Sequence, residues 1–191
     1  MVTCIFYNLR FYLAVLGQAA LLLYTTTIYA STAPAPAPAP APIVQLAYGL
    51  EVTLPGSLAL QVIAPHEQFK HPIIAGNING EASYFIAATR INDWEKNALL
   101  WNRLENQIRR KSDRNEFTIR QRGSFSTTQN IAVFFRMYEY NTNNQQHRQV
   151  YFLLNNQRAG YWLTLTMLEG ADASLIIPIA TALVRRAHML N

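Results

Sequence analysis

Gly160-Tyr-Trp-Leu-Thr-Leu-Thr-Met-Leu168 sets the fold class, because two kinds of side chain alternate along the whole stretch. The set that we expect on one face of a strand is Tyr161, Leu163, Leu165 and Met167. The set expected on the opposite face is Trp162, Thr164 and Thr166. Strict alternation is typical of a β-strand with one buried face, and antiparallel sheets accommodate such one-sided strands. The stretch therefore predicts a strand of an antiparallel sheet.

The flanking sequence predicts further strands and helices. Strand patterns cover residues 48–55, 58–63, 82–91, 117–122, 130–140 and 149–154, and helical patterns cover residues 92–111 and 173–190. Asn92 and Glu95 have the spacing of a capping box at the start of the earlier helix, and Gly123 is expected to end the strand before it. The prolines and glycines of residues 64–80 predict a loop. Together these elements predict an α+β domain in which an antiparallel sheet of about six strands packs against two helices.

The N-terminal 30 residues have the pattern of an export signal. Arg10 precedes an uncharged, largely apolar stretch over residues 11–30. This pattern favours a secretory signal peptide that is cut after Ala30. An uncleaved membrane anchor is an open alternative, since about 20 residues are enough to cross a bilayer as a helix, and a helix buried in the domain is another. Export would place the domain in the periplasm, either free or anchored to the inner membrane.

A proline-rich segment follows the leader. Residues 33–42 repeat Ala-Pro five times, and alternating prolines exclude helix and sheet because every second amide lacks its donor. Such a segment adopts extended polyproline II. We therefore expect residues 31–43 to be a stiff spacer between a membrane and an α+β domain over residues 44–191. A proline-rich ligand for a partner is the alternative.

Composition and motifs exclude several classes of protein. The chain has 191 residues, of which 50% are hydrophobic and 14% charged, which excludes a disordered chain. Cys4 is the only cysteine, so no disulfide can form within the chain. The sequence contains no zinc-protease, nucleophile-elbow, phosphate-loop or dinucleotide motif. We expect no enzyme activity and no cofactor, with a hydrolase that no motif reveals as the alternative.

His66, Glu67 and His71 form the only cluster that resembles metal ligands. A spacing of five residues does not bring two imidazoles to one face of a helix as a spacing of four does. The prolines on either side of the cluster predict a loop instead. We therefore expect no metal site there.

Basic residues concentrate between Arg103 and Arg122, where seven cations stand against three acidic residues. Clustered arginines can bind phosphates, an acidic peptide or an anionic membrane surface. Arg109, Arg110 and Arg114 are accordingly candidate partner-binding residues. A solvated helix end without a partner is the alternative. For an exported protein we expect no nucleic acid among the partners.

The strands supply a second candidate surface. Arg136, Tyr138 and Trp162, with Tyr151 beside them, could form an aromatic binding surface on an exposed face of the sheet. Tyrosine, tryptophan and arginine are the residue types that anchor protein interfaces. Aromatic residues in strands are also typical of a core or of cross-strand pairs, so plain packing is the alternative.

Three stretches resemble a known family. They are Gly49-Leu-Glu-Val-Thr-Leu-Pro55, Tyr138-Glu-Tyr140, and Tyr161-Trp-Leu-Thr-Leu-Thr-Met167 followed by an acidic loop and Leu175-Ile-Ile-Pro178. With the order of elements, they resemble the PsbP-like fold and, within it, the bacterial DcrB-like group. The resemblance implies a non-enzymatic protein that binds other proteins in the cell envelope. Related Eag-type chaperones of type VI secretion imply the alternative, a chaperone or immunity-type protein that sequesters an apolar segment of a secreted effector.

Overall fold

The computed structural model describes residues 41–56, 58, 60–65, 70–78, 81–91, 96–156 and 159–190. The predicted leader at 1–30 and nearly all of the spacer lie outside the described residues. The same holds for His66 and Glu67 of the predicted loop, and for Asn92 and Glu95 of the predicted capping box.

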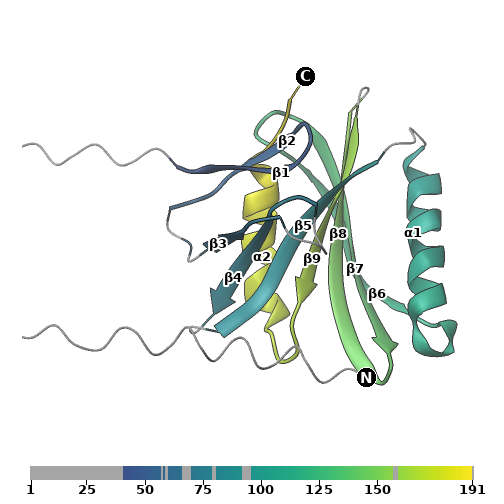
Figure 1. The fold of residues 1–191 in the computed structure, drawn as a ribbon. Coiled ribbons are helices and arrows are strands. Elements are labelled where there is room, and N and C mark those ends of the chain that lie inside the picture. Colours follow the sequence, from purple (N-terminus) through teal and green to yellow (C-terminus); the bar gives the residue numbers. More distant parts are fainter. Residues whose placement is uncertain are drawn as a thin grey trace, which may run out of the picture. The chain divides into compact units, whose positions relative to one another are not determined.

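Within the described residues the chain forms two antiparallel sheets and two α-helices (Figure 1). The small sheet has the order β1-β2-β10, with β1 at Ile43–Ala47, β2 at Leu50–Thr53 and β10 at Ala187–Met189. The large sheet has the order β3-β4-β5-β9-β8-β7-β6. Its strands are β3 (Leu60–Ile63), β4 (Ile73–Ile78), β5 (Glu81–Ile91), β6 (Thr118–Ser126), β7 (Ala132–Thr142), β8 (Gln145–Asn155) and β9 (Gly160–Met167). The helices are α1 (Asn97–Lys111) and α2 (Ala173–Arg185), and a short 3-10 turn follows α1 at Asp113–Asn115.

The large sheet is covered on both faces (Figure 1). On one face, α2 and the small sheet close the main hydrophobic core, which includes Phe152, Leu163 and Ile176. On the other face, α1 closes a smaller core, which includes Trp101, Tyr138 and Leu153. A sheet with apolar residues on both faces needs a layer on each side.

The alternation predicted for residues 160–168 is confirmed. In β9 the side chains of Tyr161, Leu163, Leu165 and Met167 are buried, whereas those of Trp162, Thr164 and Thr166 are half-buried. The strand lies between β5 and β8 and pairs with both antiparallel. The α+β class and the two packed helices are confirmed with it.

The expected loop at residues 64–80 is wrong in its second half, which forms β4. Ile73, Ile74 and Ala75 are buried there, so a short apolar run stands where the glycines predicted only turns. Gly76 has a packing role instead, because a Cβ at this position would lie 2.1 Å from the ring of Tyr84 on β5. A glycine inside a strand marks such a close approach.

Three other boundaries differ from the prediction. β6 continues through Gly123, whose bare backbone accommodates the ring of Phe135 on β7. The last helix ends at Arg185, and the chain then pairs with β2 as β10. With β1 and β4, this strand adds three to the seven predicted strand stretches, so the described residues form ten strands where the sheet was expected to have about six. α1 begins at Asn97, where the N-cap residue Lys96 makes no side-chain cap bond.

The 3-10 turn after α1 holds the β7–β8 hairpin. Asn143 and Asn144 both have positive φ, as a type I′ hairpin turn of two residues requires. The Asp113 carboxylate accepts hydrogen bonds from their backbone N–H groups at 3.1 Å and 3.0 Å. This contact fixes the C-terminal end of α1 against the end of the large sheet.

Candidate functional site

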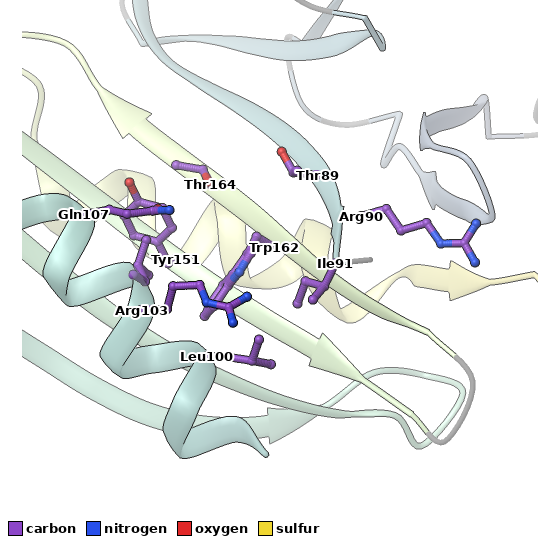
Figure 2. A pocket seen from close by; sticks show the side chains of 10 residues that line it. Thr89, Arg90, Ile91, Leu100, Arg103, Gln107, Tyr151, Trp162 and Thr164 are labelled. Atoms are coloured by element: carbon purple, nitrogen blue, oxygen red, sulfur yellow. The ribbon is translucent and has the colours of Figure 1, made fainter. Parts of the chain in front are cut away.

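A cleft of about 370 Å³ opens between α1 and the large sheet (Figure 2). It is lined by Thr89, Arg90, Ile91, Leu100, Arg103, Leu104, Gln107, Tyr151, Trp162 and Thr164. The helix supplies one wall, and β5, β8 and β9 supply the floor. About half of these side chains are apolar or aromatic, which is typical of a pocket that binds a partner group and orients it with a few polar contacts.

Trp162 is the centre of the floor. Its ring meets that of Trp101 edge-on at 4.8 Å between centroids, and that of Tyr151 at 6.2 Å. The Tyr151 hydroxyl donates to Gln149 Oε1 at 2.8 Å, which directs it along the sheet. Burial raises the pKa of Tyr151, so this hydroxyl stays protonated and keeps its hydrogen bond. The contact of Trp162 with Trp101 and the hydrogen bond of Tyr151 to Gln149 therefore hold the aromatic floor in place.

The rim of the cleft is polar. Arg103 and Gln107, one turn apart on α1, are exposed, and Figure 2 shows the Arg103 side chain extending toward the floor. Arg90 points away from the cleft in the same view, and its guanidinium lies 5.5 Å from the ring centroid of Tyr48. Arg103 is therefore the lining cation that faces the cleft.

A polar cluster beside the cleft ties α1 to the sheet. Glu105 accepts a hydrogen bond from Arg136 Nη1 at 2.5 Å and one from the Tyr138 hydroxyl at 2.9 Å. The Arg136 guanidinium also lies 4.5 Å from the ring centroid of Trp101. Burial, and then the Glu105 carboxylate, raise the pKa of Tyr138, so its hydroxyl remains a donor. The cluster therefore links α1 to β7 beside the cleft.

The expected exposed face of Arg136, Tyr138 and Trp162 is in fact covered by α1. Tyr138 is fully buried and Arg136 is paired with Glu105, so of the three only Trp162 lines the cleft. The expectation of exposure fails because the apolar stripe of α1 packs on these strands. Sequence reasoning missed the contribution of Thr89, Arg103 and Gln107 to this cleft. Thr89 reaches Trp162 through the pairing of β5 with β9, and Arg103 and Gln107 line the cleft only because α1 packs on the sheet.

Arg109, Arg110 and Arg114 lie away from the cleft floor, at the C-terminal end of α1 and in the turn that follows. All three are exposed. Arg109 lies 5.0 Å from the ring centroid of Phe117 and donates to the backbone oxygen of Asn115 at 3.3 Å. Among the described residues, no carboxylate forms an ion pair with any of the three.

Replacing Arg109, Arg110 and Arg114 together with glutamate should leave the fold intact. Exposed charges contribute about 0–1 kcal/mol each to stability, and the cation–π contact of Arg109 adds no more than about 1 kcal/mol. Thermal unfolding followed by circular dichroism should give a cooperative transition that is moved by a few degrees. Loss of the cooperative transition would show that these arginines have a structural role.

No group of three or more His, Cys, Asp or Glu side chains that could hold a metal is found in the part of the chain that the structure describes. His71 is within that part, but the other two members of the predicted cluster are not. Over the same residues, no helix is long and apolar enough to cross a membrane.

Comparison with known proteins places the fold. No protein-family model matches the chain, and no curated protein matches it. The structure of LpqN from Mycobacterium tuberculosis, described as involved in cell envelope biogenesis, matches with a TM-score of 0.53 and 9% identity, over 74% of this chain and 83% of that chain. Cyanobacterial PsbP from Synechocystis sp. PCC 6803 matches with a TM-score of 0.50 and 8% identity, over 74% and 86%. Identities this low show the fold alone, and that fold is PsbP-like.

Proposed function

We propose that this chain is an exported, non-enzymatic binding module of the bacterial cell envelope, which receives a segment of a partner protein in the cleft under α1. The leader pattern supports export, and the spacer pattern supports a domain held away from a membrane. The fold is shared with LpqN, which is described as involved in cell envelope biogenesis. A protein that acts by binding a partner needs an accessible surface with residues that anchor interfaces, and the cleft offers Trp162, Tyr151 and Arg103.

Trp162 is the observation that carries this proposal. A half-buried tryptophan at the floor of an open cleft offers a large apolar surface that is already held in place by Trp101 and Tyr151. Such preorganised aromatic residues contribute much of the binding energy at protein interfaces. An apolar partner side chain would pack on this ring, and Arg103 and Gln107 would bind polar groups beside it.

The mixed lining favours this function over a chaperone that sequesters an apolar helix. A chaperone of that kind needs a long apolar groove, whereas here α1 already covers β7 and β8 on that face of the sheet. The polar groups of Thr89, Thr164 and Gln107 line the remaining space. Buried polar groups that a purely apolar ligand leaves without partners weaken its binding.

Photo-crosslinking in the bacterium that makes the protein tests this proposal. A photoreactive residue at Gln107, on the rim, should give a discrete product with one envelope protein, and the product should be found in the envelope fraction. The same residue at Gln61, which is exposed on β3, should not give that product. Filling the cleft with Thr89→Trp should abolish the product, whereas Thr128→Trp, at an exposed loop position, should not.

Three results would contradict the proposal. They are an equal product from Gln107 and Gln61, a product that survives Thr89→Trp, and a full-length chain found only in the cytosol. Thr89 is exposed, so Thr89→Trp blocks the cleft without removing a core contact. Its thermal transition should therefore match that of the unmodified chain.

A further inference from the structure

β6 is one of the two edge strands of the large sheet, and β7 separates it from the strands that line the cleft. It is nine residues long, contains no proline, and pairs only with β7 among the described residues. Of its side chains only that of Phe125 is half-buried, and the others are exposed. A long edge strand presents about every second N–H and C=O group to solvent, ready to pair with another extended chain.

Arg122 gives this edge an unbalanced positive charge. It stands directly opposite Arg136 in the register of β6 and β7, and like charges at such positions destabilise a sheet. Glu105 already pairs with Arg136. In the described part of the chain, no carboxylate lies within ion-pair distance of Arg122.

The basic residues extend along both faces of the edge. A bulge between Ile119 and Gln121 turns Arg120 to the face of Glu139, which it contacts at 2.6 Å. On the other face, Arg109 lies over Phe117, immediately before the strand begins. Residues 109–126 contain six cations and two acidic residues. An extended segment along β6 would therefore meet the unbalanced charge of Arg122 and Arg109 on one face, whereas Arg120 on the other face is already paired with Glu139.

We propose that the free edge of β6 binds an extended acidic segment of a partner protein, which adds an eighth strand to the large sheet. Backbone hydrogen bonds would hold the segment. Carboxylates at every second position would lie on the face of Arg122 and Arg109 and balance the charge there. This surface is separate from the cleft, so the proposal does not depend on the proposed function of Trp162.

A second copy of this chain fits the edge less well. Antiparallel pairing of two β6 strands along their full length would place Arg122 of one copy opposite Arg122 of the other, since this residue is the middle of Thr118–Ser126. Two like charges directly opposite each other disfavour that pairing. Alternatively, the arginines at this edge could serve only to prevent such self-association. The experiment below distinguishes that role from binding of a partner.

Titration of the full chain with blocked synthetic peptides tests this proposal. The probe is a peptide of about eight residues that alternates glutamate and threonine, long enough to cover β6. One comparison peptide has lysine in place of glutamate. The other keeps the glutamates but has alternate amides N-methylated, which removes backbone hydrogen bonds without changing the charge. We expect saturable binding of the probe, slower amide exchange over residues 118–126, and affinities at least about tenfold weaker for both comparison peptides.

Arg122→Glu should weaken binding of the probe by about tenfold or more, since it turns an attraction into a repulsion. Lys70→Glu makes the same charge change next to β4, far from β6 in the strand order, and should alter the affinity by less than about twofold. Thr89→Trp should leave peptide binding unchanged, which distinguishes failure of this proposal from failure of the proposed function.

Several results would overturn the proposal. Equal binding of the N-methylated peptide would show a merely electrostatic surface, and equal weakening by Lys70→Glu would show a general charge effect. A concentration-dependent dimer that forms when Arg122 is replaced by the neutral residue alanine, with no binding of the probe, would show that the arginines only prevent self-association at this edge.

Discussion

Replacing Phe152 with alanine should lower the free energy of unfolding by about 3–5 kcal/mol. The Phe152 side chain is fully buried in the main core. Its ring centroid lies 6.0 Å from that of Phe135 and 6.3 Å from that of Phe125. Truncation removes the buried surface and leaves a cavity that three neighbouring strands cannot close. Because domains of this size are stable by only about 5–15 kcal/mol, the thermal midpoint should fall by many degrees.

Phe134→Ala is the matched control, because Phe134 lies on the adjacent strand but faces the opposite side of the sheet and is 38% exposed. The Phe134→Ala variant should lose only about 1 kcal/mol of unfolding free energy. Urea unfolding of the full chain, followed by tryptophan fluorescence, measures both variants. Equal losses from Phe152 and Phe134 would contradict the assignment of the main core to the face that α2 covers.

The strands of the large sheet that lie at its centre were predictable because each has one face that is more buried than the other. In β9 the buried set follows the period of two that the sequence displays. In β8, Val150, Phe152 and Leu154 follow the same period. One-sided burial imposes its period directly on the choice of residues, so local reasoning is sufficient there.

The strands that local reasoning missed depend on contacts with other strands that their own residues do not reveal. β10 is three residues long, and it pairs with β2 more than 130 residues earlier. As a short apolar segment directly after α2, it has the same pattern as the end of that helix. β4 is hidden by Gly76, whose meaning depends on the ring of Tyr84 across the pair. No window of sequence contains both β10 and β2, and nothing in the residues around Gly76 shows that a ring will pack against it.

The candidate site was only half predictable for the same reason. Trp162 and Arg136 were identified by residue type, but an aromatic strand face has one pattern whether it meets solvent, a partner or a helix of its own chain. Here α1 covers it with Leu100, Trp101, Leu104 and Ile108. The cleft then exists only where α1 stops covering the sheet, which is a property of how the helix is docked.

Replacing Glu105 with alanine should lower the free energy of unfolding by about 3 kcal/mol, the largest effect that we expect from a polar residue. In the part of the chain that the structure describes, Glu105 is the single side-chain acceptor for Arg136 and for the buried hydroxyl of Tyr138. Its loss leaves a partly buried charge and a buried donor without a partner, and both carry a desolvation cost. The side chains of Arg136 and Glu105 are 27% and 20% exposed, so the cost is below that of a fully buried pair. Alanine is a strong helix former, so the backbone of α1 adds no penalty.

Glu116→Ala, at an exposed position close to the end of α1, is the control and should change the free energy of unfolding by less than about 0.5 kcal/mol.

A double-mutant cycle of Glu105→Ala with Arg136→Ala measures the interaction free energy between the two side chains. If Glu105 stabilises the protein by holding Arg136, the double variant should lose about 1–3 kcal/mol less than the sum of the single variants. Additive losses of unfolding free energy would mean that the Glu105–Arg136 contact contributes little to stability, and that the apolar packing of α1 holds it on the sheet instead. The crosslink from Gln107 gives a second measurement. If the losses are coupled and Glu105→Ala also lowers the crosslinking yield, the cluster sets the width of the cleft, because the partner site depends on where α1 is held.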